Sequence, residues 1–553
     1  MAGRQASLRD FFLGGKRLPW YAVSASIVAT EISAVTYISL PSVVFKTGGN
    51  LTYLQIGLIG SLFARGFVAW KLVPAYFQRE IYSPYDFVGE RLGEGMRRAT
   101  TALFTLGGLL GQSARVYMTA VVLEVLLYEP LSSIENWCGI PPLTTAVVMI
   151  GLVAIVWTWM GGIAAVIWTD TILFVLFIVG AAVSLIVIDS SLESGLFASL
   201  PAARDLGKLQ WLDFDTSPVR AYTFWAALIG ASWGGVGSYG VDQLMAQRMF
   251  CCRNARDARK AILASYVAVA VTCVVACIGL GLWAYYREFP LQGAAAELVA
   301  SRPDRIFPVF ITEVLPAGLK GLVIAGAFAA AISSLDSILA ALCQTTLSAV
   351  FIPLRSKQNE GTTTDSEADS ASLLRLSRIL VVVWGVILCA LAIGIESIAD
   401  RYDAILDLAL AMAGYSGGAL LAAFALAYLP TGRDGRGFFW AAPLSVLWIL
   451  AVVWHEPWSL WLCAGGGVSL VVHYSWWQAR LASFSVIKSA LLALGAAGVV
   501  ATTKYAVFEG GGVVAWPWYI PLGSLIAFGF GYALSAPCIA SNAQHAQDPA
   551  TSV

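Results

Sequence analysis

The chain is a succession of long apolar segments separated by short polar ones. Roughly fourteen of these segments, between Leu18 and Ala536, reach the length of about 20 residues that a helix needs to cross a bilayer. Backbone N–H and C=O groups find no partner in lipid, so each span is expected to be a helix. The pattern therefore predicts an all-α polytopic membrane protein. The expected spans are 18–46, 52–77, 98–128, 142–163, 166–188, 220–245, 261–286, 317–350, 376–396, 404–429, 438–454, 457–475, 485–506 and 515–536.

The first ten spans fall into two groups of five, with a long polar segment between them. An odd number of spans reverses the orientation of the second group relative to the first, as in an inverted repeat. The expected divisions are a cytoplasmic N-terminus at 1–17, a first five-helix repeat at 18–188, an external loop at 189–219, a second repeat at 220–430, additional C-terminal transmembrane helices at 431–536 and a cytoplasmic tail at 537–553.

The composition agrees with a membrane protein, because 58% of the residues are hydrophobic and only 12% are charged. The formal net charge is zero, which argues against a nucleic-acid partner. Basic residues gather before the first span and after the second, sixth and eighth, so the positive-inside rule places both termini in the cytoplasm. We expect a multi-pass protein of the plasma membrane, specifically a bacterial inner membrane. The basic residues are Arg4, Arg9, Lys16, Arg17, Arg79, Arg91, Arg97, Arg98, Arg248, Arg253, Arg256, Arg259, Lys260, Arg355, Lys357, Arg375 and Arg378.

The eighth span contains an unusual polar cluster, AISSLDS at residues 331–337. On a helix, Ser333, Ser334 and Ser337 share one face, with Asp336 at its flank. A single membrane serine usually bonds back to its own helix, but an ionisable residue at membrane depth is costly and marks a functional site by default. The cluster forms an all-oxygen surface, which suits an alkali cation.

Two spans carry helix-breaking residues at corresponding places in the two repeats. The first contains ATEISAVTYISLP, with Pro41 and several polar residues, and the sixth contains GASWGGVGSYG. Membrane glycines often serve close helix packing. However, unwound backbone at membrane depth is tolerated only beside a cavity, and paired breaks are typical of a transporter binding site. The pair of breaks therefore favours a transporter.

Other ionisable residues also fall within the expected spans. Asp170 and Lys71 lie near expected cytoplasmic ends, where a long side chain can reach the interface. We expect Arg65 and Arg115 to pair with carboxylates and set helix packing rather than to contact a substrate. Three roles stay open for Glu31: contact with a substrate, uptake of a proton, or pairing with an arginine.

Catalytic and zinc sites are not expected. The three histidines, His455, His473 and His545, are far apart, and the nine cysteines show no metal-binding spacing. We find no arrangement of a nucleophile and a base, so we expect a protein that is not an enzyme.

Several motifs together resemble the sodium/solute symporter family, from about Arg9 to about Tyr428. They are DFFLGGKRLPW, SAVTYISLP, GGIAAVIWTDTILF, RAYTFW, YGVDQLMAQRM, LKGLVIAGAFAAAISSLDS and AGYSGGALLAAFAL. The resemblance implies the five-plus-five inverted-repeat fold of LeuT-type transporters and sodium-coupled symport by alternating access. Many family members carry a further helix ahead of the first motif, and the sequence leaves open whether one precedes it here.

The resemblance also implies positions for sodium. The common site of the family matches backbone carbonyls of Ala29 and Ile32 on the first helix, and Ala330, Ser333 and Ser334 on the eighth. A second sodium site, present in some relatives, matches the set Asp170, Ser333, Asp336 and Ser337.

The substrate is expected to be a small organic anion, such as a monocarboxylate. Sugar-transporting relatives carry a lysine and a glutamine where this chain has Val269 and Leu410, and an asparagine where it has Glu31. SAVTYISLP and RAYTFW are closer to the branch of iodide, multivitamin and monocarboxylate carriers. A sugar or amino-acid symporter and a transporter-like sensor are the alternatives, and no obligate protein partner is expected. The candidate substrate-binding residues are Glu31, Ser33, Thr36, Tyr117, Ser238, Tyr239 and Tyr415.

Overall fold

The computed structural model describes residues 8–32, 34–79, 81, 83–354, 367–399, 405–453, 457–481, 485–504 and 514–537. Within these ranges the regular elements are all helices, accompanied by two isolated β-bridges. The expected all-α class is therefore confirmed.

Seven helices in the described ranges are long and apolar enough to cross a membrane, and a bent pair brings the number to eight. They cover residues 56–77, 94–126, 142–191, 255–288, 317–354, 372–397 and 410–428. The remaining predicted spans correspond mainly to shorter or less apolar helices near the C-terminal end. A total of fourteen spans therefore stays a prediction.

The first predicted span is a broken helix. Helix α2 (Trp20–Glu31) and helix α3 (Ala34–Phe45) meet at an angle of 53°. Ile32 leaves the helix with φ −86° and ψ 87° while its N–H still bonds to Val28. The helical hydrogen-bond ladder stops at this point, which leaves carbonyls at the end of α2 without helical partners.

Helix α9 (Pro142–Ser191) joins two predicted spans in one run of 50 residues. A straight helix of that length would extend about 75 Å, more than twice the thickness of the hydrocarbon core. Gly162, at φ 57° and ψ −172°, interrupts the run with a non-helical conformation. The kink therefore separates the fourth span from the fifth.

The sixth predicted span is also broken, but at Asp242 and not within its glycine cluster. Two π-helical turns, η4 (Ala226–Ala231) and η5 (Gly237–Val241), flank helix α12 (Ser232–Val236), and helix α13 (Gln243–Phe250) follows. Asp242 is extended, with φ −68° and ψ 126°.

The glycines of this span pack against the second. A Cβ on Gly235 would lie 2.6 Å from the Cβ of Ala64, and one on Gly240 would lie 2.5 Å from Leu72. Neither position has room for a side chain, so the glycines allow the backbones to approach closely.

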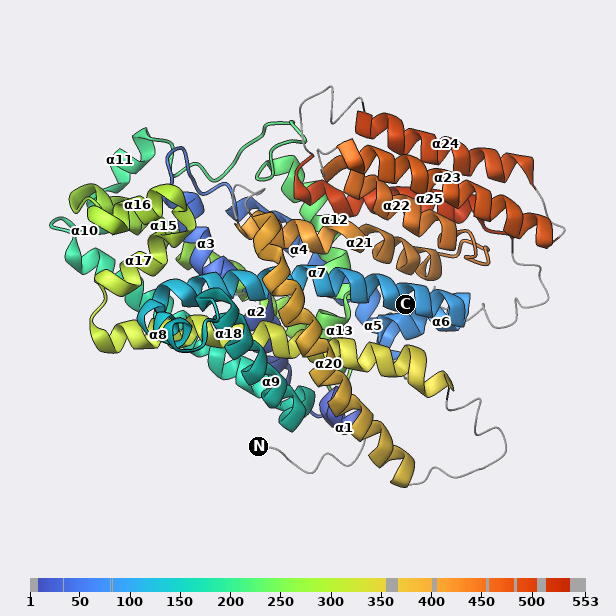
Figure 1. Cartoon of the computed structure of the whole chain (residues 1–553), viewed down its shortest axis with the longest axis horizontal. Helices are drawn as coiled ribbons and strands as arrows, with labels where there is room; N and C mark the ends of the chain where they lie inside the picture. The colour runs from blue at the N-terminus through green and yellow to red at the C-terminus, as the bar shows by residue number, and fades with distance from the viewer. Residues whose placement is uncertain are drawn as a thin grey trace.

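The central helices bring distant parts of the sequence together. Helix α18 (Ala317–Thr346) runs beside α9 and α2, and helix α7 (Glu94–Leu126) contacts helix α21 (Ile405–Tyr428) (Figure 1). The other longer elements are α1 (Leu8–Leu13), α4 (Ser61–Phe67), η3 (Val68–Leu72), α5 (Val73–Phe77), α6 (Pro84–Leu92), α8 (Tyr128–Cys138), α11 (Leu200–Asp205), α14 (Ala255–Ala264), α15 (Ala268–Glu288), α16 (Gly293–Ser301), α17 (Ile306–Glu313) and α20 (Glu367–Ala399).

Four C-terminal helices form a separate layer, drawn in orange and red in Figure 1. They are α22 (Phe438–Val453), α23 (Pro457–Arg480), α24 (Val486–Thr502) and α25 (Tyr519–Leu534). Residues such as Leu444, Tyr474 and Leu492 give this layer a small apolar core of its own. Helix α25 joins it to the rest of the protein through α21.

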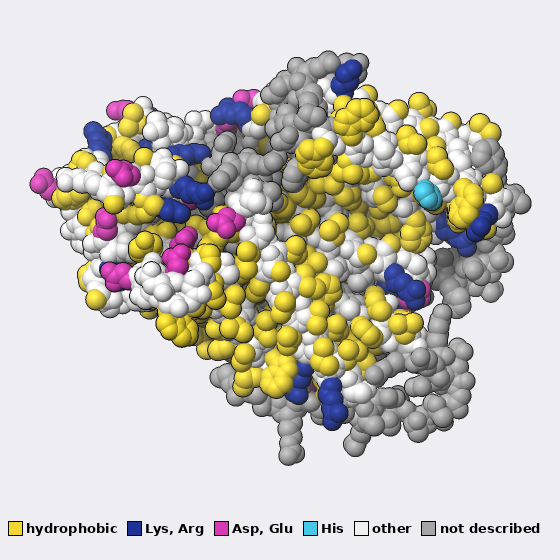
Figure 2. Space-filling model, viewed as in Figure 1, with side chains coloured by type: hydrophobic (Ala, Val, Ile, Leu, Met, Phe, Trp, Pro, Cys, Tyr) yellow, Lys and Arg dark blue, Asp and Glu magenta, His cyan; other side chains and the backbone are white. Residues whose placement is uncertain are grey.

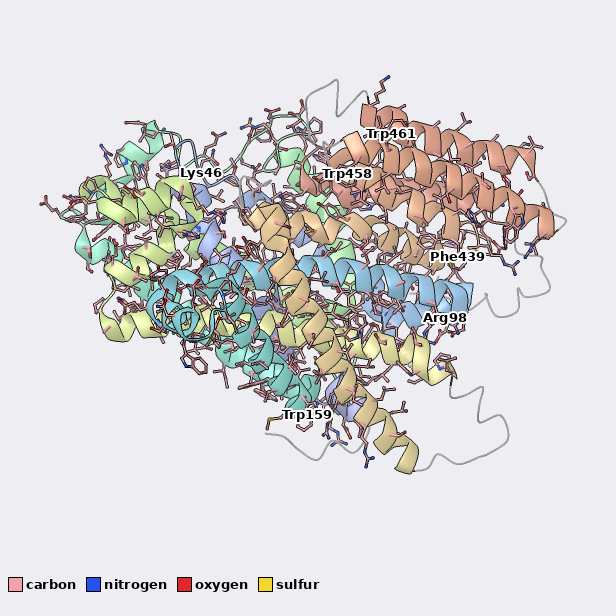
Figure 3. All side chains as sticks on the ribbon, in the orientation of Figure 1. Lys46, Arg98, Trp159, Phe439, Trp458 and Trp461 are labelled. Atoms are coloured by element: carbon pink, nitrogen blue, oxygen red, sulfur yellow. The ribbon has the colours of Figure 1, made fainter. Side chains whose placement is uncertain are left out.

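The surface has the character of a membrane protein. Hydrophobic side chains cover most of the middle of the face in Figure 2. Acidic side chains lie mainly toward the left end, and basic side chains lie there and near the other edges. Lys46, which follows α3, and Arg98, near the start of α7, lie toward opposite ends of the molecule (Figure 3). This arrangement supports the multi-pass character expected from the sequence.

Candidate functional site

Two clusters of buried charged groups lie beside the break in the first span. One joins Glu31 at the end of α2 to Arg65 of α4, and the other joins Asp170 of α9 to Arg248 of α13. Charged side chains are rare in the interior of membrane spans and are usually paired there. Both clusters are therefore candidates for function.

In the first cluster, Arg65 is held by three groups. Its Nη2 donates to Glu31 Oε2, and its Nε donates to the hydroxyl of Ser265 at 3.0 Å. The guanidinium also lies 4.2 Å from the centre of the Tyr239 ring. Tyr239 in turn donates its hydroxyl to Glu31 Oε1 at 2.8 Å. Of the three roles left open for Glu31, the structure shows pairing with an arginine.

A second arginine approaches the same break from α7. Arg115 Nη1 donates to the carbonyl of Thr30 at 3.4 Å. That carbonyl belongs to the last turn of α2, where helical partners are missing. Arg115 was expected to pair with a carboxylate, but its hydrogen bond here goes to the backbone of α2.

In the second cluster, Asp170 is completely buried. Its Oδ1 accepts from Ser333, and its Oδ2 accepts from Ser26 at 2.5 Å and from Arg248 Nη2 at 3.2 Å. Of the two interpretations left open for Asp170, a side chain that reaches the cytoplasmic interface does not fit this burial. Helix α9 directs this carboxylate against α2 and α18, where three donors satisfy it.

Arg248 lies at the centre of this cluster, although its position among basic residues had suggested a cytoplasmic loop. It is fully buried, with Nε 2.8 Å from Ser26 Oγ and with Nη2 donating to Ser337 as well as to Asp170. The break at Asp242 turns α13 back toward the core, which carries Arg248 inward.

Asp336 completes the second cluster. It is 1% exposed, and its Oδ1 accepts from the Ser337 hydroxyl at 3.2 Å. Its Oδ2 is buried without a hydrogen-bond partner among the residues that the structure describes. Asp170, Asp336 and Arg248 together carry one net negative charge when both carboxylates are ionised. A cluster of this charge, with a spare acceptor, suits a monovalent cation.

The residues expected at the sodium sites lie on helices that pack against each other. Ala29, Ile32, Ser333 and Ser334 are all buried, and α18 packs against α2. The side chain of Ala330 lies outside the described residues. For the second set, Asp170, Ser333, Asp336 and Ser337 share one connected hydrogen-bond network.

The expected substrate residues are more dispersed. Thr36 and Tyr117 are buried, whereas Ser238 is exposed one residue before Tyr239. Tyr415 is buried, and its ring lies 6.3 Å from that of Tyr519 on α25. Ser33 lies outside the described residues. Of this set, Glu31 and Tyr239 are shown in direct contact.

Comparisons with known proteins agree with the motifs. A model of the sodium:solute symporter family matches residues 11–442. The human sodium-coupled monocarboxylate transporter 1 is 29% identical over 436 residues, which are 77% of this chain and 65% of that protein. The sodium-dependent multivitamin transporter of Oryctolagus cuniculus is 25% identical over 420 residues, which are 75% of this chain and 61% of that protein. The chain therefore spans less than two thirds of the length of these curated relatives.

A solved structure shows the same fold. It is a Na+-coupled sialic acid symporter in a substrate-bound outward-open state, similar with a TM-score of 0.71 and 22% identity over 97% of this chain and 94% of that one. The named relatives are transporters, in agreement with the expectation that the chain is not an enzyme. Because the family model covers more than three quarters of the sequence, the chain belongs to the sodium:solute symporter family.

Proposed function

We propose that this protein is a sodium-coupled secondary active symporter that carries a small organic anion, such as a monocarboxylate, by alternating access. The observation that carries the proposal is the broken first span, whose end at Glu31 and Ile32 lies in a bundle that also buries Ser333 and Ser334. Family membership and the similarity to monocarboxylate and multivitamin transporters support it.

The proposed common sodium site combines carbonyls of Ala29 and Ile32 with Ala330, Ser333 and Ser334. Sodium requires oxygen ligands that replace its hydration shell. The end of α2 supplies carbonyls released from helical hydrogen bonds, and α18 supplies hydroxyls. The Ser333 hydroxyl donates its proton to Asp170, which leaves its lone pairs for a cation.

The proposed second sodium site faces a competitor in this conformation. The guanidinium of Arg248 contacts both Asp170 and Ser337, two of the four expected ligands. A sodium ion coordinated by the full set therefore requires Arg248 to withdraw. We propose that the common site binds first and that the second site depends on movement of α13.

Coupling follows if sodium prefers one conformation of the transporter. One sodium ion entering the cell at about 100 mV contributes roughly 2.3 kcal/mol, before any concentration gradient. Sodium bound between α2 and α18 favours the form that accepts substrate, and release of both follows when one bundle rocks against the other. The proposed location is the plasma membrane, specifically a bacterial inner membrane, with both termini in the cytoplasm.

Substitution of Ser334 tests the sodium site. The protein is reconstituted into liposomes, and uptake of labelled propionate is measured over a series of external sodium concentrations, with choline as the replacement. Ser334→Ala is expected to raise the sodium concentration for half-maximal uptake by about tenfold, since one charge-assisted ligand is lost. Its melting temperature without sodium should change little.

Ser348→Ala is the matched control, because that serine bonds back to its own helix at the carbonyl of Thr345. It should leave the sodium response unaltered. An unchanged sodium response in Ser334→Ala would show that the proposed site is wrong.

A further inference from the structure

The pair of Glu31 and Arg65 is buried on one side and accessible on the other. Arg65 is 1% exposed, whereas 25% of the Glu31 side chain is exposed. Glu31 ends α2 at the break of the first span, between buried Thr30 and Ile32. An ionised carboxylate that faced lipid at this depth would be costly. We therefore take the exposed side of Glu31 as the side from which a solute reaches the pair.

Arg65 has unused capacity for an anion. Its Nε and Nη2 donate to Ser265 and Glu31, but Nη1 is buried without a hydrogen-bond partner among the described residues. Arginine can donate to both oxygens of one carboxylate through parallel hydrogen bonds. Glu31 engages Arg65 through a single nitrogen and shares its other oxygen with Tyr239. The guanidinium is therefore only partly satisfied by its internal partner.

We infer that Arg65 binds the carboxylate of the transported anion and that Glu31 occupies this position until the anion arrives. An incoming carboxylate can use both Nη1 and Nη2, so it replaces one hydrogen bond with two. An uncharged solute cannot displace Glu31, because it does not supply the negative charge that a buried guanidinium needs. This inference rests on the proposed function and assigns the recognition of its substrate class to one arginine.

The position of Glu31 also connects the anion to sodium. Its backbone lies between Ala29 and Ile32, whose carbonyls are the proposed sodium ligands. Once displaced from Arg65, the carboxylate of Glu31 is uncompensated beside those carbonyls, and a sodium ion there neutralises it. Anion and sodium therefore favour each other's binding, and such coupling is reciprocal.

The test compares the binding of carboxylates with that of their uncharged amides. Propionate, benzoate, propionamide and benzamide are titrated against the purified full chain in sodium and in choline, with the melting temperature as the readout. In Glu31→Gln, the apparent Kd for the carboxylates is expected to fall roughly tenfold, because the internal competitor is removed, and the difference between sodium and choline should shrink. In Arg65→Gln, the preference for carboxylate over amide should disappear.

Two further variants make the result decisive. Glu90→Gln alters the exposed pair of Arg79 and Glu90 by the same chemical change, and it should leave every Kd unaltered. Tyr239→Phe removes only the hydroxyl that holds Glu31, so a smaller fall in Kd for the carboxylates is expected. If Glu31→Gln does not fold, the Kd of Tyr239→Phe for the carboxylates is the measurement that decides.

The inference would be overturned if the wild type bound amides as well as carboxylates. It would also be overturned if carboxylate affinity stayed the same or weakened in both Glu31→Gln and Tyr239→Phe. Failure of the proposed function has a different signature. A wild type that prefers carboxylates equally in sodium and in choline lacks sodium coupling but retains the anion site at Arg65.

Discussion

The two buried charge clusters beside the break in the first span differ in net charge and in the kind of atom that is left without a partner. Glu31 and Arg65 are a pair of opposite charges, and the spare atom is a donor, Arg65 Nη1. Asp170, Asp336 and Arg248 combine two carboxylates with one guanidinium, and the spare atom is an acceptor, Asp336 Oδ2. A neutral pair with a spare donor suits an anion, whereas a negative cluster with a spare acceptor suits a cation.

The net charge of the two clusters together does not change when two neighbouring charged residues are included. Asp242 caps α13, and Arg115 contacts the end of α2, so they add one charge of each sign. The buried set remains negative by one when all its carboxylates are ionised. One monovalent cation neutralises it, and a bound anion then requires a second cation. Under the proposed function, this comparison assigns sodium to the negative cluster and the transported anion to the neighbouring pair.

The largest expected effect comes from breaking the negative cluster. Asp170→Ala removes the carboxylate that accepts from Ser26, Ser333 and Arg248. Loss of one member of a buried ion pair costs about 3–5 kcal/mol, so the unfolding temperature in detergent should fall sharply. Asp205→Ala, at the exposed end of α11, is the control and should melt like the wild type. A wild-type melting temperature for Asp170→Ala would show that the cluster is not an important source of stability.

A substitution of Asp336 should not lower the melting temperature in the absence of sodium, in contrast to Asp170→Ala. Asp336→Asn makes the cluster neutral and removes a buried charge whose Oδ2 has no partner in the described part of the chain. We expect its melting temperature in choline to equal or exceed that of the wild type. Saturating sodium, at a hundredfold excess over its Kd, stabilises a protein by about 2.7 kcal/mol per site, and the part of the gain that comes from the second site should be lost. Retention of the full sodium gain would contradict the charge argument.

The smallest expected effect concerns a buried cation outside the spans. Its hydrogen-bond partners among the described residues are carbonyls and not carboxylates. Lys208 Nζ lies within hydrogen-bond distance of four carbonyl oxygens at the end of α3, those of Val44, Phe45, Lys46 and Gly49. These carbonyls favour the ammonium, but burial lowers the pKa of Lys208 from 10.5 to about 8.

The lowered pKa sets the sign of a pH effect. Between pH 8 and 10.5 the unfolded chain retains a proton that the folded chain has lost, so the contribution of Lys208 to stability rises with pH. Below pH 8 both states are protonated and the slope vanishes. The melting temperature of the wild type should rise relative to that of Lys208→Met between pH 8 and 10. A constant difference between the two proteins would show that burial does not govern this lysine.

Much of the site could be predicted because the bilayer makes polar residues conspicuous. Glu31, Asp170 and the serines around Asp336 interrupt otherwise apolar runs, where an ionisable group is costly. The helices and the broken first span followed from the same pattern. Recognition of the family motifs then predicted which of these residues would bind sodium, and that assignment stays a prediction.

The partners of these residues could not be predicted in the same way. Arg248 lies near other basic residues, so the positive-inside rule assigns it to a cytoplasmic loop. The turn at Asp242 brings it into the protein interior. Ser26 resembles any small residue of a membrane helix. Gly235 and Gly240 lie in a glycine-rich segment that was expected to be unwound. Whether a glycine unwinds a helix or allows close packing depends on the neighbouring helix, which the sequence of the segment does not show.

The most direct test of the central claim is a melting curve of the wild-type protein in sodium and in choline buffer. It is recorded across a panel of monocarboxylates, vitamins, amino acids, sialic acid and sugars. The account predicts that a monocarboxylate raises the melting temperature in sodium and has little effect in choline, because the two ligands bind together. Equal stabilisation in both buffers would contradict sodium-coupled binding.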